Sequence, residues 1–410
     1  MEDEPHPVYG LEALTPRCLA PSCKLETLIT GDTIRESRSK KTVSLGRSLA
    51  FGFDHALVFW GTTYEPPKAV SENTFLSSLN SHQDRGFFVA KGGADGKWTL
   101  KDFISAPYAN IVSVLPLRKA FASCSKDSFL VSALEHIEFA HVLDKTGKPG
   151  KDRFPGKRFA TIDCLSPDRT LKNLVKISEN RLYALGGVGL DAHSGALVTA
   201  AKEYNEEPYQ SAGGGATAIP WNAQASNYVT VIESTKKTTR VKSRMRVVSG
   251  PAPFFQPTVI RSEPLELLAL TEGRVLTHCT EKNKTEIACV EVEVGVPYIT
   301  DFVYRKNHGL LVAGSSYGNP QKKVPASLTS FQVAQKGAVW KVLKSEPLVT
   351  DGHAFYGLVI DSGELGGAKG QNHLLFQDFR PRSRKANQIY RLALPENSPE
   401  VSSDRPVTGS

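Results

Sequence analysis

The sequence predicts an all-β protein, a single β-propeller of seven four-stranded blades with an irregular N-terminal segment and a disordered C-terminal tail. Three observations lead to this prediction. Short apolar strands followed by glycine or a turn recur along the chain, helical periodicity is scarce, and residues 298–343 read as one complete antiparallel sheet. Such a sheet cannot bury both faces alone, so sister sheets are expected beside it.

The stretch 298–343 divides into four strands with turn residues between them. Glycine, asparagine and proline mark the turns at residues 307–309 and 318–320, and Gln335-Lys336-Gly337 marks the last one. The predicted strands are Tyr298–Tyr304, Leu310–Gly314, Ser327–Val333 and Val339–Leu343.

Similar apolar strands occur at residues 56–61, 87–90, 129–134, 182–187, 228–232, 275–279, 310–314 and 354–360. Their average spacing from Val58 to Leu358 is about 43 residues, within the roughly 40 to 50 residues of a propeller repeat. Val58 and Val89 are close enough to share a blade, which favours seven blades over six or eight. A helical period is clear only in short pieces such as residues 194–204.

The predicted domain organisation has three parts. Residues 1–42 form an irregular N-terminal segment with a candidate ring-closing strand at Leu25–Ile29, and residues 43–394 form the propeller. Residues 395–410 are rich in proline, serine and glutamate and are predicted to be a disordered tail.

Charge and composition favour a cytoplasmic or nuclear protein. The net charge is +8, a mild basic bias that suits RNA or an acidic protein surface without requiring either. The start is acidic and broken by proline, unlike a secretory signal, and no apolar run approaches the roughly 20 residues of a membrane span. The six cysteines have no metal-binding spacing, and most are predicted to be buried free thiols.

Three motifs are interpreted as structural rather than chemical. Gly314–Gly318 matches the hydrolase elbow around Ser316, but the residues that follow cannot begin the helix that this elbow needs. Gly187–Ala192 fits a loose dinucleotide fingerprint and is read as a blade-edge turn. His136, Glu138 and His141 do not share one strand face. The sequence therefore predicts no catalytic, cofactor-binding or metal site among them.

The most distinctive charge feature is a basic stripe over residues 236–246. On a strand, its alternating cations line one face and suit phosphate or an acidic partner. A solvated edge strand protected from aggregation explains the same pattern, and both interpretations stay open. The candidate partner-binding residues are Lys236, Lys237, Arg240, Lys242, Arg244 and Arg246.

The strand patterns resemble those of divergent WD-repeat or regulator-of-chromosome-condensation propellers. His55–Gly61 is similar to the latter family's histidine, apolar strand and Trp-Gly, and Asn307–Gly314 repeats it more faintly. Leu182–Gly187 is similar to the strand and double glycine of kelch repeats. The condensation-regulator resemblance implies nucleotide exchange on a small GTPase or chromatin docking, and no exchange residues carry over.

The expected function is a non-catalytic scaffold that assembles protein or ribonucleoprotein complexes, without a cofactor or a small-molecule substrate. The first alternative is a small-GTPase regulator. The second is a propeller hydrolase of the lactonase type, with acids and histidines meeting at the central channel. The residues that this second alternative would bring together are Asp54, His55, Asp301, His308, Asp351, His353 and Asp361.

Overall fold

The computed structural model describes most of the chain in segments. The described residues are 15–19, 23–37, 42–52, 56–64, 85–93, 97–106, 108–136, 139–143, 149–155, 158–176, 183–191, 194–204, 209–210, 217–218, 225–235, 238–296, 298–315, 325–336, 339–361, 373–378 and 388–394.

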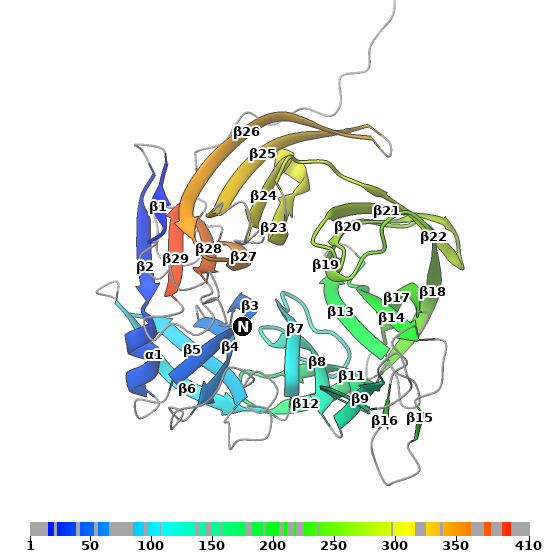
Figure 1. Cartoon of the computed structure of the whole chain (residues 1–410), viewed down its shortest axis with the longest axis horizontal. Helices are drawn as coiled ribbons and strands as arrows, with labels where there is room; N and C mark the ends of the chain where they lie inside the picture. The colour runs from blue at the N-terminus through cyan, green and yellow to red at the C-terminus, as the bar shows by residue number, and fades with distance from the viewer. Residues whose placement is uncertain are drawn as a thin grey trace, which may run out of the picture.

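The described strands confirm an all-β, propeller-like fold built from antiparallel meanders (Figure 1). Meander 1 contains β3 (Thr42–Gly52), β4 (Ala56–Tyr64), β5 (Arg85–Gly92) and β6 (Trp98–Ser105). Meander 2 contains β7 (Tyr108–Pro116), β8 (Phe129–His136), β11 (Arg158–Leu165) and β12 (Leu171–Lys176).

Meanders 3 and 4 share one eight-stranded sheet, because β18 and β22 pair in parallel at their outer edges. Meander 3 contains β13 (Tyr183–Leu190), β14 (Leu197–Tyr204), β17 (Ala225–Ser234) and β18 (Thr239–Ser249). Meander 4 contains β19 (Phe255–Ser262), β20 (Leu265–Leu270), β21 (Leu276–Asn283) and β22 (Glu286–Glu291).

Both ends of the chain contribute to the last two sheets. Meander 5 contains β23 (Ile299–Arg305), β24 (Leu310–Ser315), β25 (Ala326–Lys336) and β26 (Val339–Gly352), with β1 (Arg17–Cys18) paired to β26. Meander 6 contains β27 (Phe355–Asp361), β28 (His373–Asp378) and β29 (Gln388–Ala393), with β2 (Leu25–Ile29) paired to β29. The four strands predicted at residues 298–343 are thus confirmed as meander 5. The domain boundaries stay a prediction, and residues 395–410 lie outside the described part.

The remaining described elements are short. Two small hairpins stand apart from the meanders, and the described helices are a two-turn α-helix and one 3₁₀ turn. The elements are β9 (Phe139–Leu143), β10 (Pro149–Pro155), β15 (Tyr209–Gln210), β16 (Thr217–Ala218), α1 (Gly31–Ser37) and η2 (Lys306–His308). No helix within the described ranges has the length and apolar character needed to cross a membrane.

The prediction of seven blades is wrong. Within the described residues there are four separate sheets of four or five strands, plus the eight-stranded sheet made of two meanders. Eight recurring apolar strands gave seven blades because only one pair of them was assigned to a shared blade, whereas two pairs share a meander. The strands near Val58 and Val89 are β4 and β5 of meander 1, and those near Leu185 and Thr230 are β13 and β17 of meander 3.

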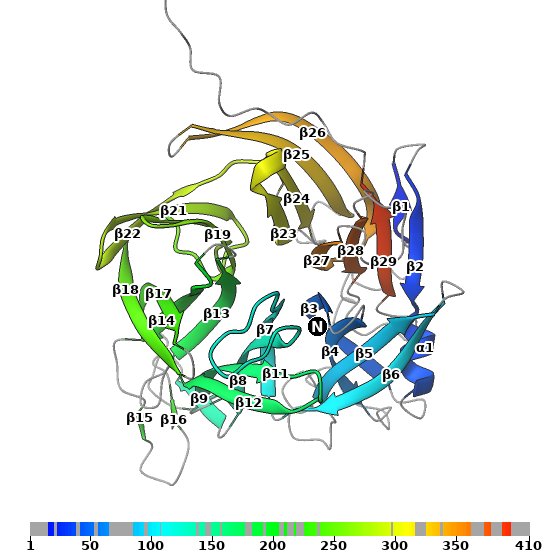
Figure 2. The same cartoon turned by 180° about the vertical axis from the view of Figure 1, so that it is seen from behind.

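The first strand of each meander lies nearest the middle of the molecule, in the order β3, β7, β13, β19, β23 and β27 (Figures 1 and 2). Polar contacts join several neighbours in this inner ring. The N–H of Val188 on β13 donates to Oγ of Ser113 on β7 at 3.1 Å. The N–H of Leu358 on β27 donates to Oδ2 of Asp301 on β23 at 2.8 Å. Hydrogen bonds as well as apolar packing therefore hold the inner strands of neighbouring meanders together.

The glycines of β13 allow close approach to β19. The N–H of Gly187 donates to the carbonyl oxygen of Phe254 at 2.8 Å, and a Cβ added at Gly189 would lie 1.8 Å from the carbonyl oxygen of Pro257. Gly187–Ala192 was predicted to be a blade-edge turn. That prediction is wrong for its first part, because β13 continues to Leu190 and the glycines serve backbone contact between strands.

The short helical period at residues 194–204 wrongly indicated a helix. Leu197–Tyr204 is β14, which pairs with β13 on one side and β17 on the other. Leu197, Val198, Thr199, Ala200 and Ala201 are all buried. A strand covered on both faces is apolar in consecutive positions, and a short apolar run cannot be separated from a helix by periodicity alone.

Apolar clusters fill the spaces between neighbouring meanders. Phe87 and Trp60 of meander 1 pack in one cluster with Phe129 and Val131 of meander 2. Likewise, Leu268 of meander 4 belongs to one cluster with residues of meander 5. Each sheet thus buries a face against its neighbour, which is the physical reason for the radial arrangement.

The prediction of free thiols is wrong. All six cysteines form disulfides: Cys18–Cys23, Cys124–Cys164 and Cys279–Cys289. Cys124 lies between β7 and β8 and Cys164 on β11, so that bond closes 40 residues within meander 2. The partners face each other only after the sheets form, which is why spacing along the chain did not reveal them.

Candidate functional site

The acids and histidines proposed to meet at the central channel have different surroundings. Asp54 and His55 lie outside the described residues, and the side chain of Asp361 is not described. Asp351 pairs with Arg17, and the N–H of His353 donates to Oδ1 of Asp378 at 2.8 Å. The carbonyl oxygen of His308 accepts from Gln332. Among the described members, Asp301 is the one built into the inner ring by its carboxyl group.

Asp301 is a buried carboxyl group on β23. Its side chain is 1% exposed, and Oδ2 accepts the N–H of Leu358 from β27. Burial raises the pKa of Asp301 to about 7, because desolvation disfavours the carboxylate. Contacts with the N–H of Leu358 and the Gln256 side chain lower the pKa but do not offset burial. The group is therefore poised to exchange a proton near neutral pH.

Three inner strands surround this carboxyl group. Gln256 on β19 has a φ of 51°, in the left-handed region that side chains other than glycine seldom adopt. At normal hydrogen-bond geometry, Oε1 of Gln256 and Oδ1 of Asp301 have no partner among the described residues. Incompletely satisfied buried polar atoms and strained backbone are costly, and both are typical of functional sites.

A cation lies near the start of β23. The guanidinium of Arg274 stands over the ring of Phe255, 3.9 Å from its centroid, and Nη1 donates to the carbonyl oxygen of Thr300 at 3.4 Å. The hydroxyl of Thr300 donates in turn to the carbonyl oxygen of Gly314 at 3.0 Å. Gln256 and Arg274 were missed from the sequence, since neither belongs to a pattern that sets it apart from other polar residues.

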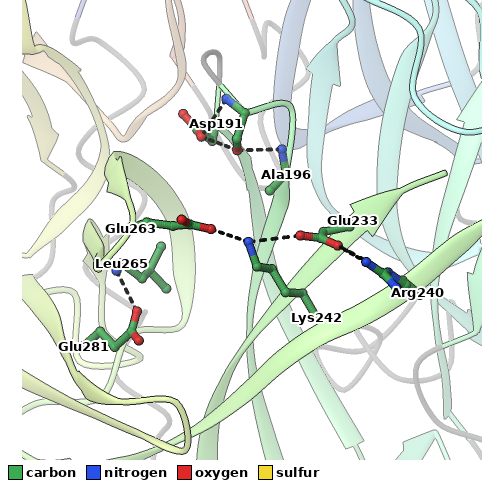
Figure 3. Close-up of polar contacts among 9 residues, drawn as sticks. Asp191, Ala196, Glu233, Arg240, Lys242, Glu263, Leu265 and Glu281 are labelled. Atoms are coloured by element: carbon green, nitrogen blue, oxygen red, sulfur yellow. Dashed lines mark hydrogen bonds and ion pairs between the residues drawn. The ribbon is translucent and has the colours of Figure 1, made fainter.

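The basic stripe lies on β18, and its described cations are exposed. Nζ of Lys242 lies between the carboxylates of Glu233, at 3.0 Å, and Glu263 (Figure 3). Arg240 also pairs with Glu233, at 2.9 Å. Arg244 pairs with Glu203 and lies over a tyrosine ring. Much of the stripe's charge is therefore compensated by neighbouring strands.

These contacts change the ionisation of their members. Hydrogen bonds from Lys242 and Arg240 lower the pKa of Glu233, and hydrogen bonds to Glu263 and Glu233 raise the pKa of Lys242. Arg246 stands near the parallel pairing with β22, so the end of β18 is not a free sheet edge. Lys236 and Lys237 lie outside the described residues. Partner binding by the stripe stays a prediction.

The described residues show no functional arrangement for the motif around Ser316 or for the histidines at 136 and 141. Ser316 lies outside the described residues, while Oγ of Ser315, at the end of β24, accepts the N–H of Ser327 at 2.9 Å. His136 and His141 fall on different strands, β8 and β9. Within the described part of the chain, no group of histidine, cysteine and acidic side chains is arranged to hold a metal ion.

No protein-family model and no curated protein matches this chain. Several solved structures of other proteins do match it. An α-L-arabinanase from Penicillium chrysogenum is 12% identical, with a TM-score of 0.49, over 92% of this chain and 100% of its own. An α-L-arabinofuranosidase of Fusarium graminearum is 11% identical, with a TM-score of 0.44, over 86% and 93%. A sialidase from Streptococcus pneumoniae is 9% identical, with a TM-score of 0.47, over 87% and 68%.

These matches bear on two expectations. The non-catalytic scaffold interpretation finds no support in them, since the similar structures are named as an arabinanase, an arabinofuranosidase and a sialidase. A divergent β-propeller is supported, whereas assignment to the WD-repeat or condensation-regulator propellers is not. With identities near 10% and TM-scores below 0.5, the matches identify neither the substrate nor the catalytic residues of this chain.

Proposed function

We propose that this chain is a propeller hydrolase in which Asp301 is the proton-transferring carboxyl group. The observation that carries the proposal is the pKa of about 7 that burial imposes on Asp301, at the meeting of β19, β23 and β27. A general acid works best when its pKa lies near the operating pH. A carboxyl group that is half protonated at neutral pH meets this demand.

In the proposed reaction, Asp301 gives its proton to the departing oxygen as the bond to the leaving group breaks. The oxygen of a water molecule then bonds to the carbon from which the leaving group departed, and the proton that this water releases returns to the Asp301 carboxylate. Oδ1 is the oxygen available for this transfer, because Oδ2 already accepts the N–H of Leu358. The side chain of Gln256 and the cation of Arg274 are the neighbouring polar groups that would orient a substrate.

A glycoside is the substrate class that we propose to assay first. The choice of compounds, an arabinofuranoside and a sialoside, follows the names of the similar structures, whereas hydrolysis itself is proposed from Asp301 alone. A lactone belongs in the same panel, since it tests hydrolysis of an ester by the same carboxyl group.

The test is release of a chromogenic phenol from the two glycosides, together with opening of the lactone, by the purified full chain. Asp301→Asn keeps an oxygen to accept the Leu358 N–H but has no proton of the required acidity. We expect this variant to lose roughly 10²- to 10⁴-fold in kcat. Asp168→Asn, on an exposed turn, is the matched control and should keep full activity.

A thermal unfolding curve for each variant separates lost chemistry from lost folding. Absence of hydrolysis in the whole panel, or full activity of a folded Asp301→Asn variant, would contradict the proposal.

A further inference from the structure

A second cluster of polar and aromatic side chains lies on the opposite face of β23 from Asp301. Side chains alternate along a strand, so Tyr304 faces away from the Asp301 carboxyl group. Tyr304 and Trp340 of meander 5 pack against the apolar cluster that includes Leu268 of meander 4. The cluster is thus formed where meanders 4 and 5 meet, and it does not depend on the proposed hydrolysis.

A buried carboxylate and a buried histidine form the centre of this cluster. Nε2 of His278 on β21 lies 2.8 Å from Oε1 of Glu266 on β20, and the two residues are 1% and 8% exposed. Gln335 from β25 also donates to Oε1 of Glu266, and Arg261 lies 3.4 Å from its second oxygen. Glu266 is therefore fully engaged, and its charge is compensated.

Two nitrogen atoms in the cluster have no hydrogen-bond partner among the described residues, although both are buried. They are Nδ1 of His278 and Nε1 of Trp340. The two rings meet edge to face with their centroids 5.4 Å apart. Buried polar atoms are nearly always paired, so this pair of atoms indicates a partner that the described residues do not supply.

The chemistry of the two atoms restricts what that group is. A carboxylate only accepts hydrogen bonds, so Nε2 of His278 carries a hydrogen, and Nδ1 is an acceptor in the form of the ring with one hydrogen. The indole Nε1 is only a donor. An anion without a hydrogen, such as a carboxylate, cannot donate to Nδ1, and an ammonium ion cannot accept from the indole. A hydroxyl group does both.

We propose that the junction of meanders 4 and 5 binds a neutral polyhydroxylated ligand, a sugar or polyol, through His278 and Trp340. One ligand hydroxyl accepts from Nε1 of Trp340 and donates to Nδ1 of His278. Further hydroxyls would be recognised by Tyr304, whose ring lies 5.3 Å from that of Trp340, and by Arg261, which is exposed and pairs with Glu266.

The surroundings of Tyr304 agree with this placement. Burial and then the negative charge of Glu266 raise the pKa of Tyr304, so the phenol keeps its hydrogen and can donate it. Gln335 and Trp340 are cross-strand partners on β25 and β26, which holds the Gln335 amide and the indole on one hairpin. The ligand would therefore bridge the two meanders.

The test uses inositol, which has no glycosidic bond, so that binding is read apart from hydrolysis. The full chain is titrated with inositol while the indole N–H resonance of Trp340, identified by its loss in Trp340→Phe, is followed by NMR. The indole resonances of Trp60 and Trp98 serve as internal references. We expect a saturable shift of the Trp340 resonance only.

Two histidine variants separate the ligand contact from the structural one. His278→Gln keeps a donor at the Nε2 position for Glu266 but removes the Nδ1 acceptor, and it should bind inositol at least about tenfold more weakly. His278→Asn keeps a polar group at the Nδ1 position and should bind more tightly than the glutamine variant.

Several results overturn the proposal. A Trp340 resonance that does not shift with inositol would mean that the two nitrogens bind water only. Equal inositol affinity in His278→Gln and the original protein would remove His278 from the site. If His278→Gln does not fold, calorimetric titration of Trp340→Phe decides, and unchanged affinity there overturns the proposal as well.

Discussion

Oδ2 of Asp301 accepts the backbone N–H of Leu358 at 2.8 Å, and this bond joins the inner strands of two neighbouring meanders. The carboxyl group is thus both a link in the ring and a group whose proton is held unusually tightly. Its pKa of about 7 compares with 3.8 for a solvated aspartate. This difference links protonation to folding, because the folded chain binds the proton more tightly than the unfolded chain.

The first prediction concerns the pH dependence of stability. Because the folded-state pKa is raised, the stabilisation from Asp301 is fully present below about pH 4 and is lost as the pH rises to about 7. The loss is on the order of 2–4 kcal/mol of unfolding free energy. Asp301→Asn should flatten the curve in this window. Urea unfolding from pH 4 to pH 8 measures the effect.

Asp168→Asn is the control for this experiment. Hydrogen bonds from the side chain and backbone of Thr170 lower the pKa of Asp168, so its stabilisation is lost only as the pH falls below the usual aspartate range. The control should leave the slope between pH 4 and pH 7 unchanged. An Asp301→Asn curve parallel to that of the original protein would refute the linkage.

The second prediction concerns the contact between β13 and β19. Gly189→Ala places a Cβ atom 1.8 Å from the carbonyl oxygen of Pro257, a backbone atom that cannot move without displacing β19. We expect a loss of about 1–3 kcal/mol or more in unfolding free energy. Gly273→Ala is the matched control, since its nearest neighbour is Oγ1 of Thr271 at 3.6 Å. Thermal unfolding that ranks the two variants equally would argue against close packing at this contact.

The third prediction concerns the disulfides. The loop closed by Cys124–Cys164 spans 40 residues and that closed by Cys18–Cys23 spans 5. Loop-closure entropy predicts a contribution of about 4 kcal/mol for the longer loop and about 2 kcal/mol for the shorter. Replacing Cys124 and Cys164 by alanine should therefore destabilise the protein more than replacing Cys18 and Cys23 by alanine. Urea unfolding under non-reducing conditions gives the order, and the reverse order would contradict the entropic account.

Local sequence patterns predicted part of the fold correctly. The strands of meander 5 followed from short apolar runs with turn residues between them, because short antiparallel neighbours are specified by nearby sequence. The blade number did not follow. β13 and β17 belong to one meander although their centres look like separate repeats, and only the pairing through β14 shows this.

The sequence predicted candidate site residues but could not select one among them. Asp301 was one of seven acids and histidines with equal claims, and nothing in its neighbours marked it. Its raised pKa arises from desolvation among β19, β23 and β27, a sum over residues far apart in the chain. The same reason hid the pairing of His278 with Glu266 and the contact of both with the hairpin of meander 5.

Local sequence is enough to specify short antiparallel strands in this protein, since the period of apolar residues and the turn chemistry act over a few neighbours. The number of meanders in the ring, the pairing of the cysteines and the desolvated carboxyl group are set only when the sheets assemble. Those outcomes depend on burial and on contacts between distant segments, and burial is a property of the assembled sheets rather than of any residue type.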